Sequence, residues 1–228
     1  MNFKAISLAA VFALGVSAQA QAASIIEEYD FTGTAGNQAF TAATNTAANI
    51  TGSNLVRGAG LTANSGSGSL NSTGFTGQAT DFLSFGFSVA DGFSVNLEQL
   101  FIGTRSSNTG PGTLGLFYNG DNFASSLFTF SQSGTSNLFS IVDLSALTGL
   151  TGSVEFRILQ IGTNSANGGA TTSSTGTFRV QDYVVSSIDN NLRFTGTVNA
   201  VASVPVPAAF WLFGSAVAGF AARKRKLG

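Results

Sequence analysis

Short runs in which apolar and polar residues alternate are the feature that most constrains the fold of this chain. Between residues 24 and 203, no stretch of helix length repeats its apolar residues every three to four positions. Apolar side chains instead occupy every second position, which is the pattern of strands with one buried face. The alternating runs are 83–89, 93–97, 114–118, 154–158, 178–188 and 192–198.

Clusters of Gly, Asn and Ser separate these runs, as turns between strands require. About ten strands in roughly 175 residues predict an all-β fold, an antiparallel β-sandwich, and among sandwiches we favour a jelly roll. The chain has 21 Phe residues, and the rows of Phe are expected to fill the space between the two sheets. Each buried Phe contributes roughly 1.5–3 kcal/mol of transfer free energy, so about a dozen can support a domain without disulfides.

One segment of the middle region is a candidate helix. It runs over residues 143–150, with Asp143 as the N-cap and Gly149 near the stop.

The N-terminal segment has the composition of a secretory signal peptide. Lys4 precedes an uncharged apolar stretch over residues 5–16, and small residues follow. We predict a signal helix over residues 1–23, with cleavage after Ala22 or Ala23 and with Ala20 as an alternative. The alternative is a buried N-terminal helix.

The C-terminal segment predicts a single transmembrane helix over residues 208–222, where Ser215 alone is polar. Its length of about 22 Å is short for a bilayer core, and counting from Val204 makes it adequate. A basic stop follows, which holds that end in the cytoplasm; it consists of Arg223, Lys224, Arg225 and Lys226. The alternative is a hydrophobic strand or core helix with a basic tail.

Charge is distributed unevenly along the chain. Residues 24–203 carry five Arg and all 11 acidic residues, a net charge of 5 − 11 = −6, between two basic ends. We therefore divide the chain into a signal peptide (1–23), an exported ectodomain (24–203) and a C-terminal segment (204–228).

Residues 204–215 read VPVPAAFWLFGS, and they stand before the end of the apolar stretch and the basic stop. This segment resembles the PEP-CTERM sorting signal, in its VPLPA-type variant, with Val206 where the variant usually has Leu. The resemblance implies that an exosortase, a polytopic membrane enzyme, cuts near the proline motif and transfers or releases the ectodomain. Both prolines lack an N–H donor and disfavour helix, so they keep the motif extended outside the bilayer. The motif consists of Val204, Pro205, Val206, Pro207, Ala208, Trp211, Leu212, Phe213, Gly214 and Ser215.

A second resemblance covers residues 28–188. The order of the segments LEQLFIGTRSSNTGP, FYNGDNFASSL, VEFRI and STGTFRVQDYVV is similar to the jelly-roll ectodomain carried by many PEP-CTERM proteins. Such domains resemble carbohydrate-binding modules in fold, which alone does not establish function.

Missing residue types exclude several chemistries. The chain has no Cys and no His, so disulfides, thiol nucleophiles and His-dependent triads or metal sites are excluded. Its basic residues are too few for nucleic-acid binding. A glycosidase pair needs two carboxylates, and we expect the acids to be isolated and solvent-facing instead; the candidates are Asp81, Asp91, Asp121, Glu155 and Asp182.

Four further expectations concern charged and aromatic side chains. Arg105 and Arg157 are expected to face inward and pair with acids. Asp182, with Glu27 (or Glu28 or Asp30), forms a candidate calcium site, although an ordinary acidic patch is favoured. No other cofactor is expected. Few aromatics remain for stacking on sugars, because residues 24–203 lack Trp and Phe is needed in the core.

The sequence predicts an exported protein, tethered to the inner membrane with a periplasmic ectodomain and then sorted by an exosortase. Its destination is the cell surface or extracellular matrix, with a structural or adhesive role in an exopolysaccharide biofilm or floc. It is not expected to be an enzyme. The alternative is a non-catalytic carbohydrate-binding protein, and the least favoured class is a polysaccharide-degrading enzyme.

Overall fold

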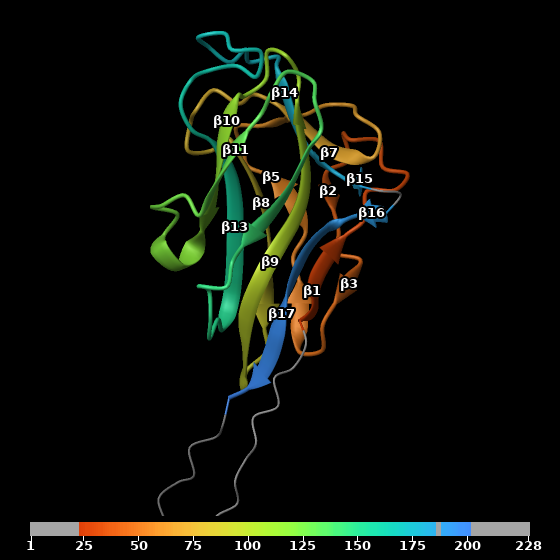
Figure 1. Ribbon diagram of the computed structural model, residues 1–228, viewed down its shortest axis with the longest axis vertical. Helices are drawn as coiled ribbons and strands as arrows, with labels where there is room; N and C mark the ends of the chain where they lie inside the picture. Colours follow the sequence, from red (N-terminus) through yellow and green to blue (C-terminus); the bar gives the residue numbers. More distant parts are fainter. Residues whose placement is uncertain (1–22, 186–187, 202–228) are drawn as a thin grey trace, which may run out of the picture.

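Two antiparallel β-sheets pack face to face in this chain, as the computed structural model in Figure 1 shows. The structure describes residues 23–185 and 188–201. Within these residues it contains strands β1 to β17 and one short 3₁₀ turn, η1 (Asn119–Asp121).

The first sheet has eight strands, and its longest strand, β9, lies near its centre. Strands β17 and β14 follow one another along one side of β9, and β12 pairs with the other side. Following the hydrogen-bonded pairs from one strand to the next, the strands are β3 (Asn45–Thr46), β1 (Ser24–Tyr29), β17 (Leu192–Ala200), β9 (Phe93–Ser106), β14 (Thr177–Gln181), β7 (Ser69–Thr73) and β6 (Thr62–Ala63), with β12 (Leu138–Asp143) beside β9.

The second sheet has seven strands, and a separate hairpin completes the fold. The sheet consists of β11 (Phe128–Ser131), β10 (Thr113–Tyr118), β13 (Gly152–Gln160), β8 (Phe82–Val89), β5 (Leu55–Arg57) and β2 (Phe40–Thr41), with β4 (Ile50–Gly52) beside β8. The hairpin pairs β15 (Tyr183–Val185) with β16 (Ile188–Asn190).

The chain passes from one sheet to the other at most of the connections in the core. It does so from β7 to β8, from β8 to β9, from β9 to β10, from β12 to β13 and from β13 to β14. This winding between two antiparallel sheets is that of a jelly roll. The predicted fold class, an all-β sandwich of jelly-roll type, is therefore confirmed.

The predicted alternation identifies the buried face of the central strands. In β8 the side chains of Leu83, Phe85 and Phe87 are buried, and in β13 those of Phe156 and Ile158 are. The side chains next to them in the sequence point away from the core, so the residues buried in both strands are those that the alternation predicts.

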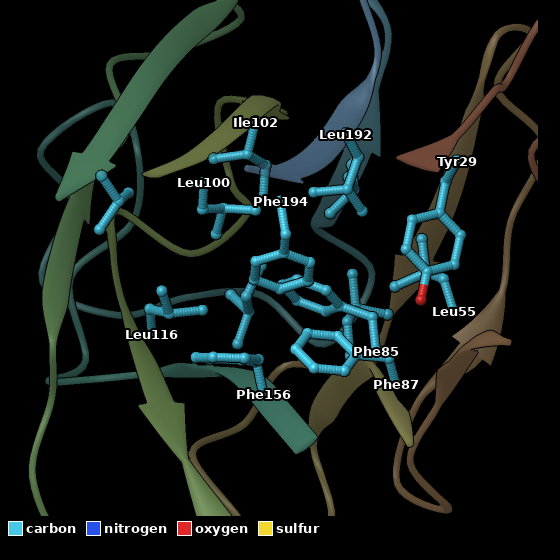
Figure 2. Packing of buried hydrophobic residues seen from close by; sticks show 14 of the residues in the cluster. Tyr29, Leu55, Phe85, Phe87, Leu100, Ile102, Leu116, Phe156, Leu192 and Phe194 are labelled. Carbon is cyan, nitrogen blue, oxygen red and sulfur yellow. The ribbon is translucent and has the colours of Figure 1, made fainter. Parts of the chain in front are cut away.

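Phe194 of β17 lies at the centre of the core (Figure 2). Its ring centroid is 5.6 Å from that of Phe85, 5.8 Å from that of Phe87 and 4.9 Å from that of Phe156. Phe194 belongs to the first sheet and the other three to the second, so this cluster joins the two sheets. Aromatic pairs at such distances contribute about 0.5–1.5 kcal/mol beyond the area that they bury.

A bulge in β9 reverses the alternation of that strand. Val95 and Leu97 are buried, Glu98 and Gln99 are both exposed, and burial resumes at Leu100. The pairing with β17 shifts by one residue at the same place. The extra residue turns the following odd-numbered side chains to the outer face of the sheet.

The helix predicted over residues 143–150 is not formed, and this prediction was wrong. Asp143 ends β12, and its Oδ1 accepts the N–H of Ser145 at 2.9 Å. Leu147 donates its N–H to the carbonyl of Leu144, and Leu150 then pairs with Val95 of β9. The expected capping bond therefore forms, but it closes a turn.

The signal helix (1–23) and the transmembrane helix (208–222) lie outside the described residues, except for Ala23, which is exposed. In the part of the chain that the structure describes, no helix has the length and apolar character needed to cross a membrane.

Candidate functional site

The sorting-motif residues predicted at positions 204–226 and the cleavage position Ala22 also lie outside the described residues. The described chain reaches both segments from one end of the sandwich. Ser24 begins β1 opposite Gly196, and β17 ends at Ala200. Strands β1 and β17 are antiparallel neighbours, so the start of the first lies beside the end of the last.

Three aromatic side chains and one arginine form a row across the outer face of the first sheet, which we call the aromatic ladder: Arg193, Phe101, Phe139 and Tyr183. The Arg193 guanidinium lies 4.2 Å from the centroid of the Phe101 ring. The Phe101 and Phe139 centroids are 6.4 Å apart. Phe139 and Tyr183 stack in parallel, with centroids 5.3 Å apart and planes 3° apart. The three rings are partly exposed, and Ile141 beside Phe101 is 51% exposed.

Gly103 leaves room for the end of this ladder. A Cβ on Gly103 would lie 2.5 Å from the carbonyl oxygen of Gln181 and 2.9 Å from the Cβ of Tyr183. At this point the chain leaves the sheet after β14 and forms the hairpin β15–β16 before it returns as β17 (Figure 1). The predicted strand 178–188 is therefore interrupted after Gln181, and Tyr183 packs over the outer face of β9.

Two arginines, which we call the arginine pair, lie side by side on the same outer face. Arg105 of β9 and Arg179 of β14 are direct cross-strand partners. Each Nε is buried without a hydrogen-bond partner, and within the described residues neither guanidinium has an ion pair. Burial and the Arg105 charge lower the pKa of Arg179. The expectation that Arg105 pairs with an acid was therefore wrong.

The second sheet carries a different arginine on its outer face. Arg157 donates from Nε to Glu155 at 2.8 Å, and Glu155 also accepts the hydroxyl of Ser84. The Arg157 guanidinium lies between two rings, 4.3 Å from the Phe82 centroid and 3.9 Å from the Phe123 centroid. The predicted pairing of Arg157 with an acid is confirmed, although the pair faces outward.

Glu27 is fully buried inside the sandwich, which sequence reasoning did not anticipate. Its Oε1 accepts the N–H of Ser53 at 2.9 Å, and its Oε2 has no hydrogen-bond partner. Burial raises the pKa of Glu27 to about 8, against the opposing effect of the hydrogen bond from the Ser53 N–H. The carboxyl group is therefore mostly protonated at neutral pH.

Asp182 has a structural contact of its own. Both of its carboxylate oxygens lie within 3.3 Å of the Phe31 N–H, just after the end of β1. The described residues contain no group of three or more acidic side chains arranged to hold a metal ion. Glu27 accepts its bond from Ser53, and the calcium site of Asp182 with Glu27 stays a prediction.

Asp81 corrects the expectation that the acids are all solvent-facing, because it is only 3% exposed. Its Oδ2 accepts the N–H and hydroxyl of Thr76 and the N–H of Gln78. Burial favours the neutral carboxyl, but these bonds outweigh it, and the pKa of Asp81 is lowered. Asp91 and Asp121 are exposed, as expected.

One open pocket of about 160 Å³ lies beside β13 and is lined by Thr76, Gln160, Thr163, Thr171 and Thr172. Gln160 Nε2 donates to the Thr172 hydroxyl at 2.8 Å, and Gln160 Oε1 is buried without a partner. The lining offers hydroxyl and amide groups but no side chain with the acid–base chemistry of a carboxylate pair.

The fold and its surface define a β-sandwich domain with an aromatic and cationic outer face, and residues 202–228 follow it in the sequence. That segment matches the family model described as the PEP-CTERM protein-sorting motif over residues 203–226. The chain therefore carries a PEP-CTERM sorting motif, which implies export and membrane-anchored sorting through an exosortase. The resemblance is confirmed, and the VPLPA-type variant stays a prediction.

Solved structures of carbohydrate-binding modules are similar to the sandwich at low identity. A mutant of a family 29 module is 11% identical, with a TM-score of 0.38, over 76% of this chain and 91% of that chain. A mutant of the module CBM29-2 complexed with cellulohexaose is 12% identical, with a TM-score of 0.37, over 76% of this chain and 89% of that chain. No curated protein matches the chain.

Proposed function

We propose that the protein is a non-catalytic structural or adhesive component of an exopolysaccharide matrix, such as a biofilm or floc. The sorting motif over residues 203–226 carries the proposal. A signal peptide directs export, the C-terminal helix tethers the protein to the inner membrane with its ectodomain in the periplasm, and an exosortase then delivers the ectodomain to the cell surface or matrix. The position of β1 and β17 supports this order, because both terminal segments join the sandwich at one end.

Intact-mass analysis and cell fractionation of the protein from its native host test the sorting step. In wild-type cells we expect the mass to lack the residues after about Val204 and the protein to leave the inner membrane. In cells without the exosortase we expect a larger membrane-bound form. The proposal fails if the C-terminal segment persists in both strains.

Proline substitution tests the motif itself. Replacing Pro205 and Pro207 by Ala restores N–H donors and helix propensity where the motif is proposed to be extended, so processing is expected to stop. Pro111 lies in the ectodomain, so Pro111→Ala is the matched control and is expected to be processed normally. Equal processing of all three forms would contradict the assigned role of the motif.

A second candidate function is carbohydrate binding by the ectodomain, favoured by the partly exposed rings of the aromatic ladder. Binding of the purified protein to a glycan array separates this function from a purely structural one. Incubation with the polysaccharide of the native host tests the enzyme class, because release of shorter chains would show catalysis.

A further inference from the structure

The arginines of the ectodomain are concentrated on one surface. Five arginines occur in the described residues, and three of them lie on the outer face of the first sheet: Arg105, Arg179 and Arg193. The ectodomain as a whole is acidic, so this face differs in charge from the rest of the domain.

The two arginines that lie elsewhere have partners that satisfy them. Arg57 donates to the carbonyls of Gln38 at 2.6 Å and Gly36 at 2.7 Å. Arg157 is paired with Glu155 and covered by two rings. These two side chains therefore have structural roles within the domain.

The arginine pair has no comparable role. Arg105 and Arg179 are adjacent like charges, and like charges directly opposite on neighbouring strands destabilise a sheet. Neither guanidinium forms a hydrogen bond or ion pair with any residue that the structure describes, and both Nε atoms are withdrawn from water. A Cβ added to Gly66 would lie 3.3 Å from Arg179 Nη1, so the loop that carries Gly66 runs close to this guanidinium. The arrangement costs free energy that an anion bound between the two side chains would offset.

The surroundings of the pair indicate what kind of anion fits. Gly103 lies two residues before Arg105 on β9 and faces the same side of the sheet. Tyr183 packs over Gly103 and stacks on Phe139. Aromatic side chains beside a planar cation suit a ligand with alternating apolar ring faces and anionic groups. Glu28 of β1 is the cross-strand partner of Arg193 on β17. Its carboxylate accepts hydrogen bonds from the side chains of Asn45 and Asn191, and it does not contact the arginine pair through any of these bonds.

We propose that the outer face of the first sheet binds a polysaccharide bearing carboxylate groups, with the carboxylates on Arg105 and Arg179 and the sugar rings along Phe139 and Tyr183. This inference rests on the proposed role in an exopolysaccharide matrix and names the chemistry of the ligand. Arginine suits this role because its planar fork presents parallel donors to both oxygens of a carboxylate.

Calorimetric titration of the full chain in neutral detergent tests the proposal, with polygalacturonate as the probe. Highly methyl-esterified polygalacturonate is the matched control ligand, because it has the same backbone without the charge. We expect the acidic form to bind at least about tenfold more tightly, since hydrogen bonds to charged groups are worth about ten- to hundredfold in affinity. Its affinity should also fall as salt is added. Equal binding of both forms, or binding of neither, would overturn the proposal.

Substitution of the pair locates the site. The double variant Arg105→Gln with Arg179→Gln is expected to lose about ten- to hundredfold in affinity for polygalacturonate. Arg157→Gln removes one arginine from the opposite sheet and is expected to bind as the unaltered chain does. A double variant that retains its affinity, or an Arg157→Gln variant that loses as much, would overturn the proposal.

Single variants keep the test informative if the double variant does not fold. Each one removes the like-charge repulsion, so Arg105→Gln and Arg179→Gln should raise the melting temperature while they weaken binding. A lower melting temperature would instead show that the arginines stabilise the domain, against the proposal. The sorting function is read independently, from the mass of the processed chain in its native host.

Discussion

Glu27 and Tyr29 lie two residues apart on β1, and both side chains are completely buried in the sandwich. The Tyr29 hydroxyl donates to the carbonyl of Ser53 at 2.8 Å, and the Ser53 N–H donates to Glu27. An irregularity in the pairing of β1 with β17 turns Ile26 and Glu27 inward in succession. A carboxyl group therefore occupies a position next to the aromatic core.

This burial predicts a stability that falls as pH rises. The pKa of Glu27 is about 8 in the folded chain and near its ordinary value of 4.5 when unfolded, so the folded state binds the extra proton between these values. The free energy of unfolding should decrease from about pH 4.5 to about pH 8, by up to about 5 kcal/mol, and then level off. Urea unfolding at a series of pH values measures this change.

Substitution of Glu27 tests whether this residue causes the pH dependence of stability. Glu27→Gln resembles the protonated carboxyl, so its stability should be nearly constant from pH 5 to pH 8. Glu98→Gln, at an exposed position of β9, is the control and should keep the slope of the unaltered chain. A slope that survives in Glu27→Gln would mean that another group carries the proton.

Asp81 predicts a pH dependence of opposite sign: its contribution to the free energy of unfolding is lost as the pH becomes acidic. Its pKa is lowered in the folded chain, so its contribution is present above the unfolded pKa and is lost as pH falls through the folded pKa. Asp81→Asn should cost about 1–3 kcal/mol at pH 7, because the bonds from Thr76 and Gln78 weaken. Chemical unfolding at pH 7 and pH 3 should show that the cost shrinks in acid. Asp91→Asn, at an exposed turn, should change stability by less than about 0.5 kcal/mol.

Two phenylalanines of the first sheet allow the stability contributed by packing in the core and by packing on the outer face to be compared. Phe194→Ala removes the ring that joins the two sheets and should destabilise the domain by about 3–5 kcal/mol. Phe101→Ala removes the same group from the outer face and should cost about 1 kcal/mol or less, the scale of an exposed cation–π contact. Urea denaturation of both variants measures the difference, and similar costs would contradict the assignment of the two faces.

Gly103→Ala tests the close approach beneath Tyr183. The added methyl group would meet the Gln181 carbonyl and the Tyr183 side chain, so the corner between β14 and β15 must move. We expect a loss of about 1–3 kcal/mol and a weaker near-ultraviolet circular dichroism signal from tyrosine. Gln99→Ala, exposed on the same strand, is the control; if Gly103→Ala were equally mild, the contact would not be tight.

The alternating runs were sufficient to predict the sandwich and the buried face of its central strands. They were insufficient where the backbone departs from strict alternation. The bulge at Glu98 places Phe101 on the outer face, whereas the row that begins at Phe93 would place it in the core. The irregularity in β1 similarly buries Glu27. Such bulges depend on the pairing partner, which no single run specifies.

The candidate site was predicted only in part. The sorting motif is continuous in the sequence and could be found from local residues alone. The arginine pair joins residues far apart in the chain, and only the register between β9 and β14 brings Arg105 and Arg179 together. The aromatic ladder likewise depends on the hairpin that carries Tyr183 over Gly103.

The lengthwise arrangement of β9 and β17 has a mechanical consequence. The chain leaves the sandwich at Ala200, which pairs with Phe93, while Arg105 lies about 40 Å farther along β9, at about 3.3 Å per residue. Tension between the arginine pair and an attachment after β17 would run parallel to the strands. The hydrogen bonds between β9 and β17 are perpendicular to that direction, so they would resist together in shear rather than open one after another.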